Sequence, residues 1–310
     1  MKRAFVLFAA MISTGVLAQF NISRADALND IAHYHEILGR VHYNPYQNIS
    51  RKEYAKAEKQ LLAGVGDSIA IKDFTLLLYR LTALLGDGHT APALIQPLFK
   101  NEYRNETFFP CQVVVTPGSV YLPEQARQWG IVPGSQLLAI NGRSAASLLA
   151  TFTSLTGGTP QYRSEMAGRL FPHFLFLLGE KAPFTVSYFT PDGTPGSVTI
   201  NEGVRYRASL AANMPHMDKK YDFRVIDNKL GYLNFMSMSG KWEDFGKFAD
   251  SCFTALAQQK IPAIAIDLRQ NSGGDSMLAD VLLSHLTKKK YNLMGKRYWK
   301  VSREYKDYLR

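Results

Sequence analysis

An apolar strand pattern followed by a pair of glycines does most to constrain how this chain can fold. The run from Ala263 to Ile266 is apolar on both faces, which is typical of a strand inside a parallel sheet that is covered by helices. Gly273 and Gly274 follow the run, and a helical pattern starts directly after them. Sites in α/β folds form at the carboxyl ends of such strands, so this turn is the first candidate site.

The glycine pair has two interpretations. Glycine tolerates dihedrals that turn backbone amides toward a substrate carbonyl, and the helix that begins beside the pair adds partial positive charge. Together these features could hold an oxyanion. The alternative is an ordinary strand-to-helix turn, in which glycine relieves crowding and Asp275 or Ser276 caps the helix. Spacing alone leaves both interpretations open.

The chain from residue 19 onward is predicted to form three structural segments. Residues 19–85 predict helices, because Ser23 and Ser50 each begin a capping-box pattern before an apolar stripe. From Phe108 onward, short apolar runs alternate with turn residues, and a hairpin is expected over residues 184–200, so this segment should be mostly β. Strands over 230–236 and 263–268 flank a helix over 242–259, which predicts a βαβ unit.

The amino terminus predicts export. Lys2 and Arg3 precede an apolar run that reaches Leu17 and a small-residue site that ends at Ala18, which is the pattern of a secretory signal peptide cleaved after Ala18. The protein is therefore expected in the periplasm or outside the cell. No later apolar run has the roughly 20 residues of a membrane helix, so no stable membrane insertion is expected.

Charge and cysteine usage exclude several functions. The net charge is +10, but residues 288–310 hold nine basic residues against two acidic ones, so the rest of the mature chain is near neutral. Since an exported protein also meets no chromosome, nucleic-acid binding is not expected. His33 and His35 are two residues apart, face different sides of a helix, and have no partner at zinc spacing, so no metal or cofactor is predicted. Cys111 and Cys252 could pair or remain buried thiols.

Four segments have motifs that match one known family in the same order along the chain. Residues 85–89 read LGDGH, 132–142 read VPGSQLLAING, 231–235 read GYLNF, and 267–274 read DLRQNSGG. The second of these resembles the end of a PDZ-like domain. Together the four resemble the C-terminal processing, or tail-specific, serine peptidases and their tricorn-core relatives.

The resemblance implies an α/β fold with an order of parts. After the signal peptide at 1–18 come an amino-terminal helical segment at 19–100, a PDZ-like β-rich domain at 108–205, and the first part of a βαβ crotonase/ClpP-like catalytic core at 222–310. It also implies a secreted serine-type endopeptidase that cleaves peptide or protein substrates by acyl transfer without a cofactor. The alternative is a non-catalytic protein on the same fold that binds peptides or hydrophobic ligands.

The same resemblance assigns roles to individual residues. Gly273 and Gly274 would stabilise the oxyanion, and His89 would act as general base with Asp87 as its orienter. The alternative for His89 is a helix cap that packs under the sheet. Three further residues are expected to support the turn through charge-assisted hydrogen bonds: Asp267, Arg269 and Asn271.

No segment of this sequence matches the family's motif for the nucleophilic serine. In the family it is a serine at the start of a helix well downstream of the glycine pair. Ser276 is expected to cap its helix, and Ser302 lies among bulky charged residues, so neither is expected to attack a substrate. Since the sequence stops at Arg310, we expect either a truncated product, which we favour, or an inactive variant. A truncated product should leave the edge of its sheet uncovered and should be poorly soluble.

Overall fold

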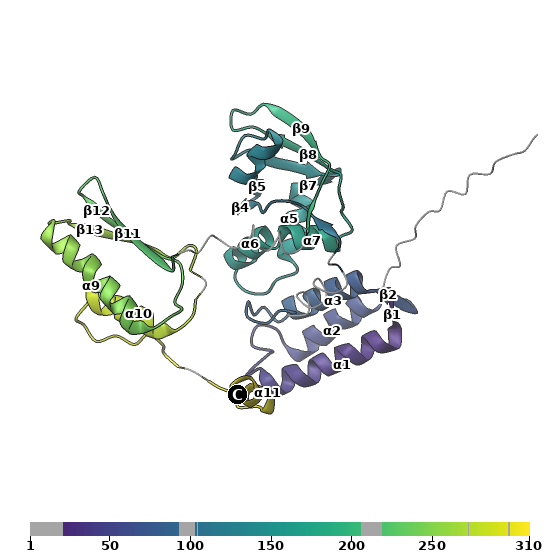
Figure 1. Ribbon diagram of the computed structural model, residues 1–310. Coiled ribbons are helices and arrows are strands. Elements are labelled where there is room, and N and C mark those ends of the chain that lie inside the picture. The colour runs from purple at the N-terminus through teal and green to yellow at the C-terminus, as the bar shows by residue number, and fades with distance from the viewer. Residues whose placement is uncertain (1–20, 93–102, 104, 206–218, 272, 297) are drawn as a thin grey trace, which may run out of the picture. The chain divides into compact units, whose positions relative to one another are not determined.

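The computed structural model describes residues 21–92, 103, 105–205, 219–271, 273–296 and 298–310. The chain divides into two compact units, residues 1–213 with 300–310, and residues 214–299, and helices and strands occur in both (Figure 1). The predicted signal peptide lies outside the described residues. Within the described ranges, no helix combines the length and apolar character needed to cross a membrane.

The first unit begins with three helices and a short two-stranded sheet. The helices are α1 (Arg24–Val41), α2 (Arg51–Leu62) and α3 (Ile71–Ala83), and β1 (Asn21–Ser23) pairs with β2 (Ser68–Ala70) in antiparallel fashion. The predicted capping box at Ser50 is confirmed, because its hydroxyl accepts the Glu53 amide and the Glu53 carboxylate accepts the Ser50 amide. The apolar stripes of these helices meet in one core cluster that includes Ala27, Ile31, Phe74, Leu77 and Leu81.

A sheet follows in the same unit. Its strands lie in the order β4 (Val114–Thr116), β5 (Ser119–Tyr121), β6 (Gln136–Ile140), β8 (Phe184–Phe189) and β9 (Pro195–Ile200), with β7 (Arg143–Ser144) paired to β6. A short helix η1 (Glu124–Trp129) links β5 and β6, and β3 (Thr107–Phe108) pairs with β10 (Val204–Arg205). The predicted hairpin is confirmed, since β8 and β9 pair from Phe184 opposite Ile200 to Phe189 opposite Pro195.

The middle segment is more helical than the mostly β unit that its sequence predicts. Three helices lie between β7 and β8, namely α5 (Ala145–Thr153), α6 (Pro160–Arg169) and α7 (Phe171–Leu177). Side chains of Ser144 and Thr159 cap the first two helices, and Pro160 occupies the first turn of α6, where its missing amide costs nothing. All of α7 is buried, so its packing against the sheet core outweighs its short length.

The second unit contains the predicted βαβ arrangement. Its sheet has the order β11 (Tyr221–Ile226), β12 (Leu230–Phe235) and β13 (Ala263–Asp267), with α9 (Trp242–Gln258) and α10 (Ser276–Leu286). The parallel pairing of β12 with β13 confirms the βαβ prediction. Strand β11 was not predicted, because it begins at the end of a stretch interpreted as a polar linker. Strand β13 is only half-buried, unlike the fully covered strand expected, because the core packs on one face of this sheet.

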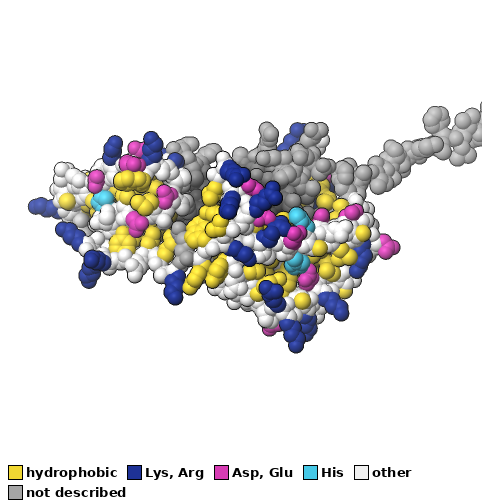
Figure 2. Space-filling model, turned by 90° about the horizontal axis from the view of Figure 1, so that it is seen from below, with side chains coloured by type: hydrophobic (Ala, Val, Ile, Leu, Met, Phe, Trp, Pro, Cys, Tyr) yellow, Lys and Arg dark blue, Asp and Glu magenta, His cyan; other side chains and the backbone are white. Residues whose placement is uncertain are grey.

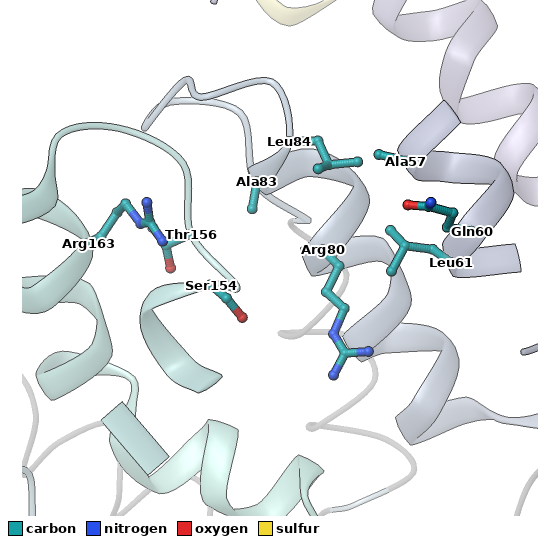
Figure 3. A pocket seen from close by; sticks show the side chains of 9 residues that line it. All are labelled: Ala57, Gln60, Leu61, Arg80, Ala83, Leu84, Ser154, Thr156 and Arg163. Carbon is teal, nitrogen blue, oxygen red and sulfur yellow. The ribbon is translucent and has the colours of Figure 1, made fainter. Parts of the chain in front are cut away.

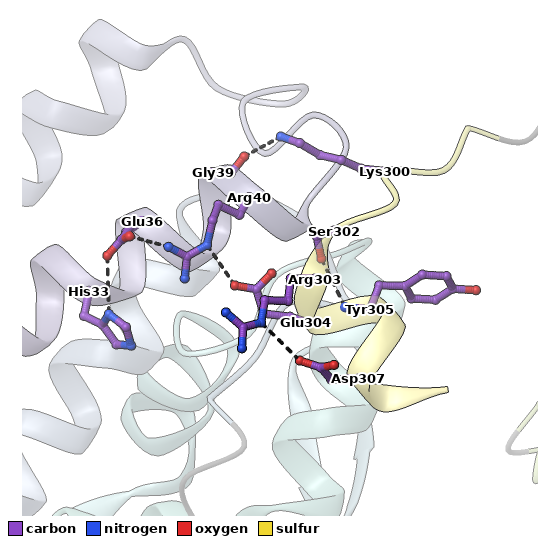
Figure 4. A network of polar contacts seen from close by, with 10 residues as sticks. All are labelled: His33, Glu36, Gly39, Arg40, Lys300, Ser302, Arg303, Glu304, Tyr305 and Asp307. Atoms are coloured by element: carbon purple, nitrogen blue, oxygen red, sulfur yellow. Dashed lines mark hydrogen bonds and ion pairs between the residues drawn. The ribbon is translucent and has the colours of Figure 1, made fainter. Parts of the chain in front are cut away.

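The last residues of the chain return to the first unit. Ser302 caps the short helix α11 (Arg303–Tyr308), and Arg40 of α1 donates to Glu304 at 2.8 Å and also pairs with Glu36 (Figure 4). Lys300 donates to the carbonyl of Gly39. These bonds are exposed and individually weak, but together they tie the carboxyl-terminal segment to α1. On the face shown in Figure 2, Lys and Arg side chains are scattered among acidic and neutral ones.

Candidate functional site

The loop after α3 brings Asp87 and His89 together. The Asp87 carboxylate accepts the His89 backbone amide at 3.0 Å and the Thr90 hydroxyl at 2.6 Å. Its second oxygen also lies 3.1 Å from His42 Nε2. One carboxylate therefore organises the loop, and its partners come from the loop itself and from the end of α1.

His42 is a member of this cluster that the sequence did not single out. It is the C-cap residue of α1, 45 positions before Asp87. Its Nδ1 accepts the Asn44 amide at 3.1 Å, so in a neutral ring Nε2 carries the proton and donates it to Asp87. Only the fold reveals this contact, because no short-range spacing pattern connects the two residues.

The His89 side chain is the exposed part of the cluster. Its imidazole is fully solvent-accessible, and Nδ1 lies 3.7 Å from Asp87 Oδ1. This distance suits an electrostatic pair but exceeds that of a hydrogen bond. His89 thus does not pack under a sheet, and its ring is available to accept a proton from a bound molecule.

A glycine-rich segment braces the Asp87 loop from the other side. The Gly158 amide donates to the Gly86 carbonyl at 3.1 Å, and the Tyr162 hydroxyl donates to the Gly88 carbonyl at 2.9 Å. A Cβ atom at Gly157 would lie 2.6 Å from the Asp87 carbonyl oxygen, so only glycine permits this approach. The backbone that carries His89 is therefore held on two sides.

Acid should loosen this loop through Asp87. Burial would raise the pKa of Asp87, but hydrogen bonds from Thr90, the His89 amide and His42 outweigh it and hold the pKa below 3.8. A lowered pKa stabilises the fold above the unfolded value, and this contribution is lost as pH falls through the folded value. We expect Asp87→Asn to flatten the loss of stability below about pH 4, measured by urea unfolding. The exposed Asp30→Asn is the control, and identical pH profiles for the Asp87 variant and the parent would contradict the assignment.

The glycine turn in the second unit has the left-handed backbone that its sequence predicts. Gly273 has φ 82° and Gly274 has φ 136°. The Met238 amide donates to the Gly273 carbonyl at 3.0 Å, and the Asp275 amide donates to the Met238 carbonyl at 2.8 Å. These two bonds fasten the turn to the segment that follows β12.

The two candidate oxyanion amides differ in their bonding. Gly273 donates its amide to Asn271 Oδ1 at 2.8 Å, and the Asn271 side chain in turn donates to the Phe235 carbonyl at 2.8 Å. The Gly274 amide has no hydrogen-bond partner among the described residues, and Gly274 is exposed. Asp275 caps α10 by accepting the Met277 amide. In this state the turn therefore offers one open amide, at Gly274.

Asp267 and Arg269 hold the end of β13. The Tyr232 hydroxyl donates to Asp267 at 2.5 Å, and Arg269 donates to both carboxylate oxygens, at 2.9 and 2.6 Å. The Arg269 side chain, followed by the Tyr232 hydroxyl, keeps the pKa of Asp267 well below its ordinary value. All donors of this cluster point at one carboxylate, so its arrangement suits support of the turn.

The remaining candidate side chains have structural surroundings. The prediction that Ser276 caps its helix is wrong, because Asp275 is the cap and Ser276 is the first residue of α10. The Ser302 hydroxyl accepts the Tyr305 amide at 3.1 Å. Cys111 and Cys252 are free and buried, and burial raises the pKa of their thiols to about 12 and about 11, so both stay protonated. Across the described part of the chain, no three His, Cys, Asp or Glu side chains gather as a metal site would require.

Comparison with known proteins identifies the fold. No protein-family model and no curated protein sequence matches the chain. Two solved structures of CPAF, a chlamydial serine protease, do match: mature CPAF, with a TM-score of 0.51, and mature CPAF complexed with lactacystin, with 0.53. Each is 20% identical and covers 84% of this chain, which spans 58% and 59% of the respective CPAF chains. The fold is therefore similar to that of CPAF, and the likeness does not single out the tricorn-core relatives.

Proposed function

We propose that this chain carries the general-base and oxyanion parts of a serine-type endopeptidase of the tail-specific kind. His89 is the general base, Asp87 orients it, and the turn at Gly273 and Gly274 stabilises the oxyanion during acyl transfer through the open amide of Gly274. The observation that carries this proposal is the Asp87 carboxylate, which lies beside a fully exposed imidazole and is itself held by His42. The CPAF-like fold supports the reaction class.

The chemistry follows from what each group can do. An imidazole titrates near neutral pH and can take a proton from a nucleophile and return it to a leaving amine. A carboxylate beside it stabilises the imidazolium that forms. The open amide of Gly274 and the start of α10 behind it supply donors and partial positive charge for a developing oxyanion.

His42 acts as a positioning residue in this proposal. It donates to the Asp87 oxygen that faces away from His89, and the Asn44 amide fixes the ring that does so. Loss of this donor would free the Asp87 side chain to rotate and would leave His89 without a fixed neighbour.

We propose further that these 310 residues bind peptides without cleaving them. The hydroxyl of Ser302 is engaged in capping, and Ser276 follows the cap residue of its helix. We interpret 108–205 as PDZ-like and 222–310 as the first part of a crotonase/ClpP-like core, and the amino-terminal sequence supports export. The positions of Ser302 and Ser276 also favour the second candidate function, a peptide- or hydrophobic-ligand-binding protein.

Fluorescein-labelled, unfolded casein tests this proposal with the full 310-residue chain. We expect fluorescence polarisation to report saturable binding while acid-soluble fluorescence, which measures cleavage, stays at the level of the buffer blank. Cleavage that disappears in His89→Ala would show that the chain contains its own nucleophile. Absence of both binding and cleavage would contradict the peptidase proposal and its binding alternative.

A further inference from the structure

An open pocket of about 500 Å³ lies in the first unit, where α2 and α3 face the loop that follows α5. Figure 3 shows Arg80 extending from α3 between the α2 side chains and a second group that contains Ser154, Thr156 and Arg163. The lining residues are Ala57, Gln60, Leu61, Arg80, Ala83, Leu84, Ser154, Thr156 and Arg163. The pocket shares no residue with the Asp87 cluster.

The charge of this pocket is unbalanced. The Arg80 guanidinium has no hydrogen bond or ion pair with any residue in the described ranges. Arg163 donates through Nε to the Thr153 carbonyl at 2.7 Å, which fixes its position and leaves its terminal nitrogens available. The described lining contains no Asp or Glu. Two cations thus border the space, and the described lining residues supply no anion to balance them.

The uncharged part of the lining selects among anions. Ala57, Leu61, Ala83 and Leu84 form an aliphatic wall, which is poorly suited to a fully hydrated ion such as sulfate. Guanidinium groups bind carboxylates through two parallel N–H bonds. A ligand that has one carboxylate and a short aliphatic arm satisfies both sides of the pocket.

We propose that this pocket binds the carboxylate of an aliphatic acid, supplied either by a small molecule or by an acidic side chain of a peptide. The peptide source rests on the proposed function, whereas the small-molecule source does not. Thr156 of the pocket directly precedes Gly157 and Gly158, which brace the Asp87 loop. A ligand here would therefore contact the segment that supports His89.

Saturation-transfer NMR on the full chain at low ionic strength tests the site with hexanoate. Hexylamine and hexanamide have the same arm and no carboxylate, and we expect neither to compete with hexanoate. Arg80→Gln removes a side chain without a partner in the fold and should raise the Kd for hexanoate about five- to tenfold. Lys56→Gln, the same loss of charge at an exposed residue of α2, should leave the Kd unchanged.

Two peptides distinguish the sources. One is acetylated, amidated Ala-Ala-Glu-Ala-Ala, and the other has Gln in place of Glu. If only the Glu peptide displaces hexanoate, the carboxylate comes from a peptide. If neither peptide displaces it, the ligand is a small acid. Equal Kd values for parent and Arg80→Gln, or equal binding of hexanoate and hexanamide, would overturn the proposal. These experiments measure binding alone, so their outcome does not depend on whether the chain hydrolyses any substrate.

Discussion

Replacing His89 with alanine is expected to lower the rate at which the chain hydrolyses p-nitrophenyl butyrate by about tenfold to a hundredfold. This activated ester needs no serine nucleophile, because a general base can direct water at its carbonyl. The His89 ring is fully exposed and lies 3.7 Å from the Asp87 carboxylate, so it can take up the proton and remain stabilised. Initial rates of nitrophenolate release measure the effect.

An exposed histidine elsewhere provides the control for this prediction. His33 is also on the first unit, its side chain is 65% exposed, and its Nδ1 lies 3.5 Å from Glu36, so it imitates the imidazole and carboxylate pair of His89. His33→Ala should leave the rate unchanged, whereas His42→Ala should lower it through Asp87. Equal effects of the His89 and His33 substitutions would mean that any surface imidazole accounts for the hydrolysis.

Gly274→Ala is expected to destabilise the second unit by about 3 kcal/mol or more. A Cβ atom at this position would lie 2.4 Å from the Met238 carbonyl oxygen and 2.6 Å from its carbon. Both are backbone atoms and cannot turn aside as a flexible side chain would. The turn must therefore separate from the segment after β12 and lose two backbone hydrogen bonds. Hydrogen exchange of peptides from β12 and β13 measures this loss.

The neighbouring glycine is the matched control. Gly273 has φ 82°, but a Cβ atom there would meet nothing within 4 Å, so Gly273→Ala should cost only the strain of a left-handed residue, about 1 kcal/mol. A similar loss of protection in both variants would show that backbone dihedrals, and not the approach of Met238, account for the need for glycine.

The parts of this fold that sequence predicted well are local. The capping box at Ser50, the β8–β9 hairpin and the βαβ order of the second unit each depend on residues close together in the chain. Strand β11 was missed because half-buried strands with polar neighbours resemble linkers. Helix α7, which lies between β7 and β8, was missed because all of it is buried, so its sequence lacks the alternation of apolar and polar residues that marks a surface helix.

The candidate site shows the same division. The motif residues Asp87, Gly273 and Gly274 stand out because they lie in short motifs that resemble those of one family and occur in the same order. The contact between His42 and Asp87 spans 45 positions, and the approach of Gly157 to Asp87 depends on tertiary packing. Neither leaves a spacing signal, because it is the fold that brings these residues to one place.

The central proposal is that His89 is a general base and the Gly273–Gly274 turn holds an oxyanion, while neither Ser276 nor Ser302 is the attacking serine. A fluorophosphonate probe, with adducts mapped by mass spectrometry, tests it most directly. We predict that no serine of the 310-residue chain is labelled under conditions in which His89-dependent ester hydrolysis is measurable. Stoichiometric labelling of one serine that Asp87→Asn and His89→Ala abolish would contradict the claim and identify the nucleophile.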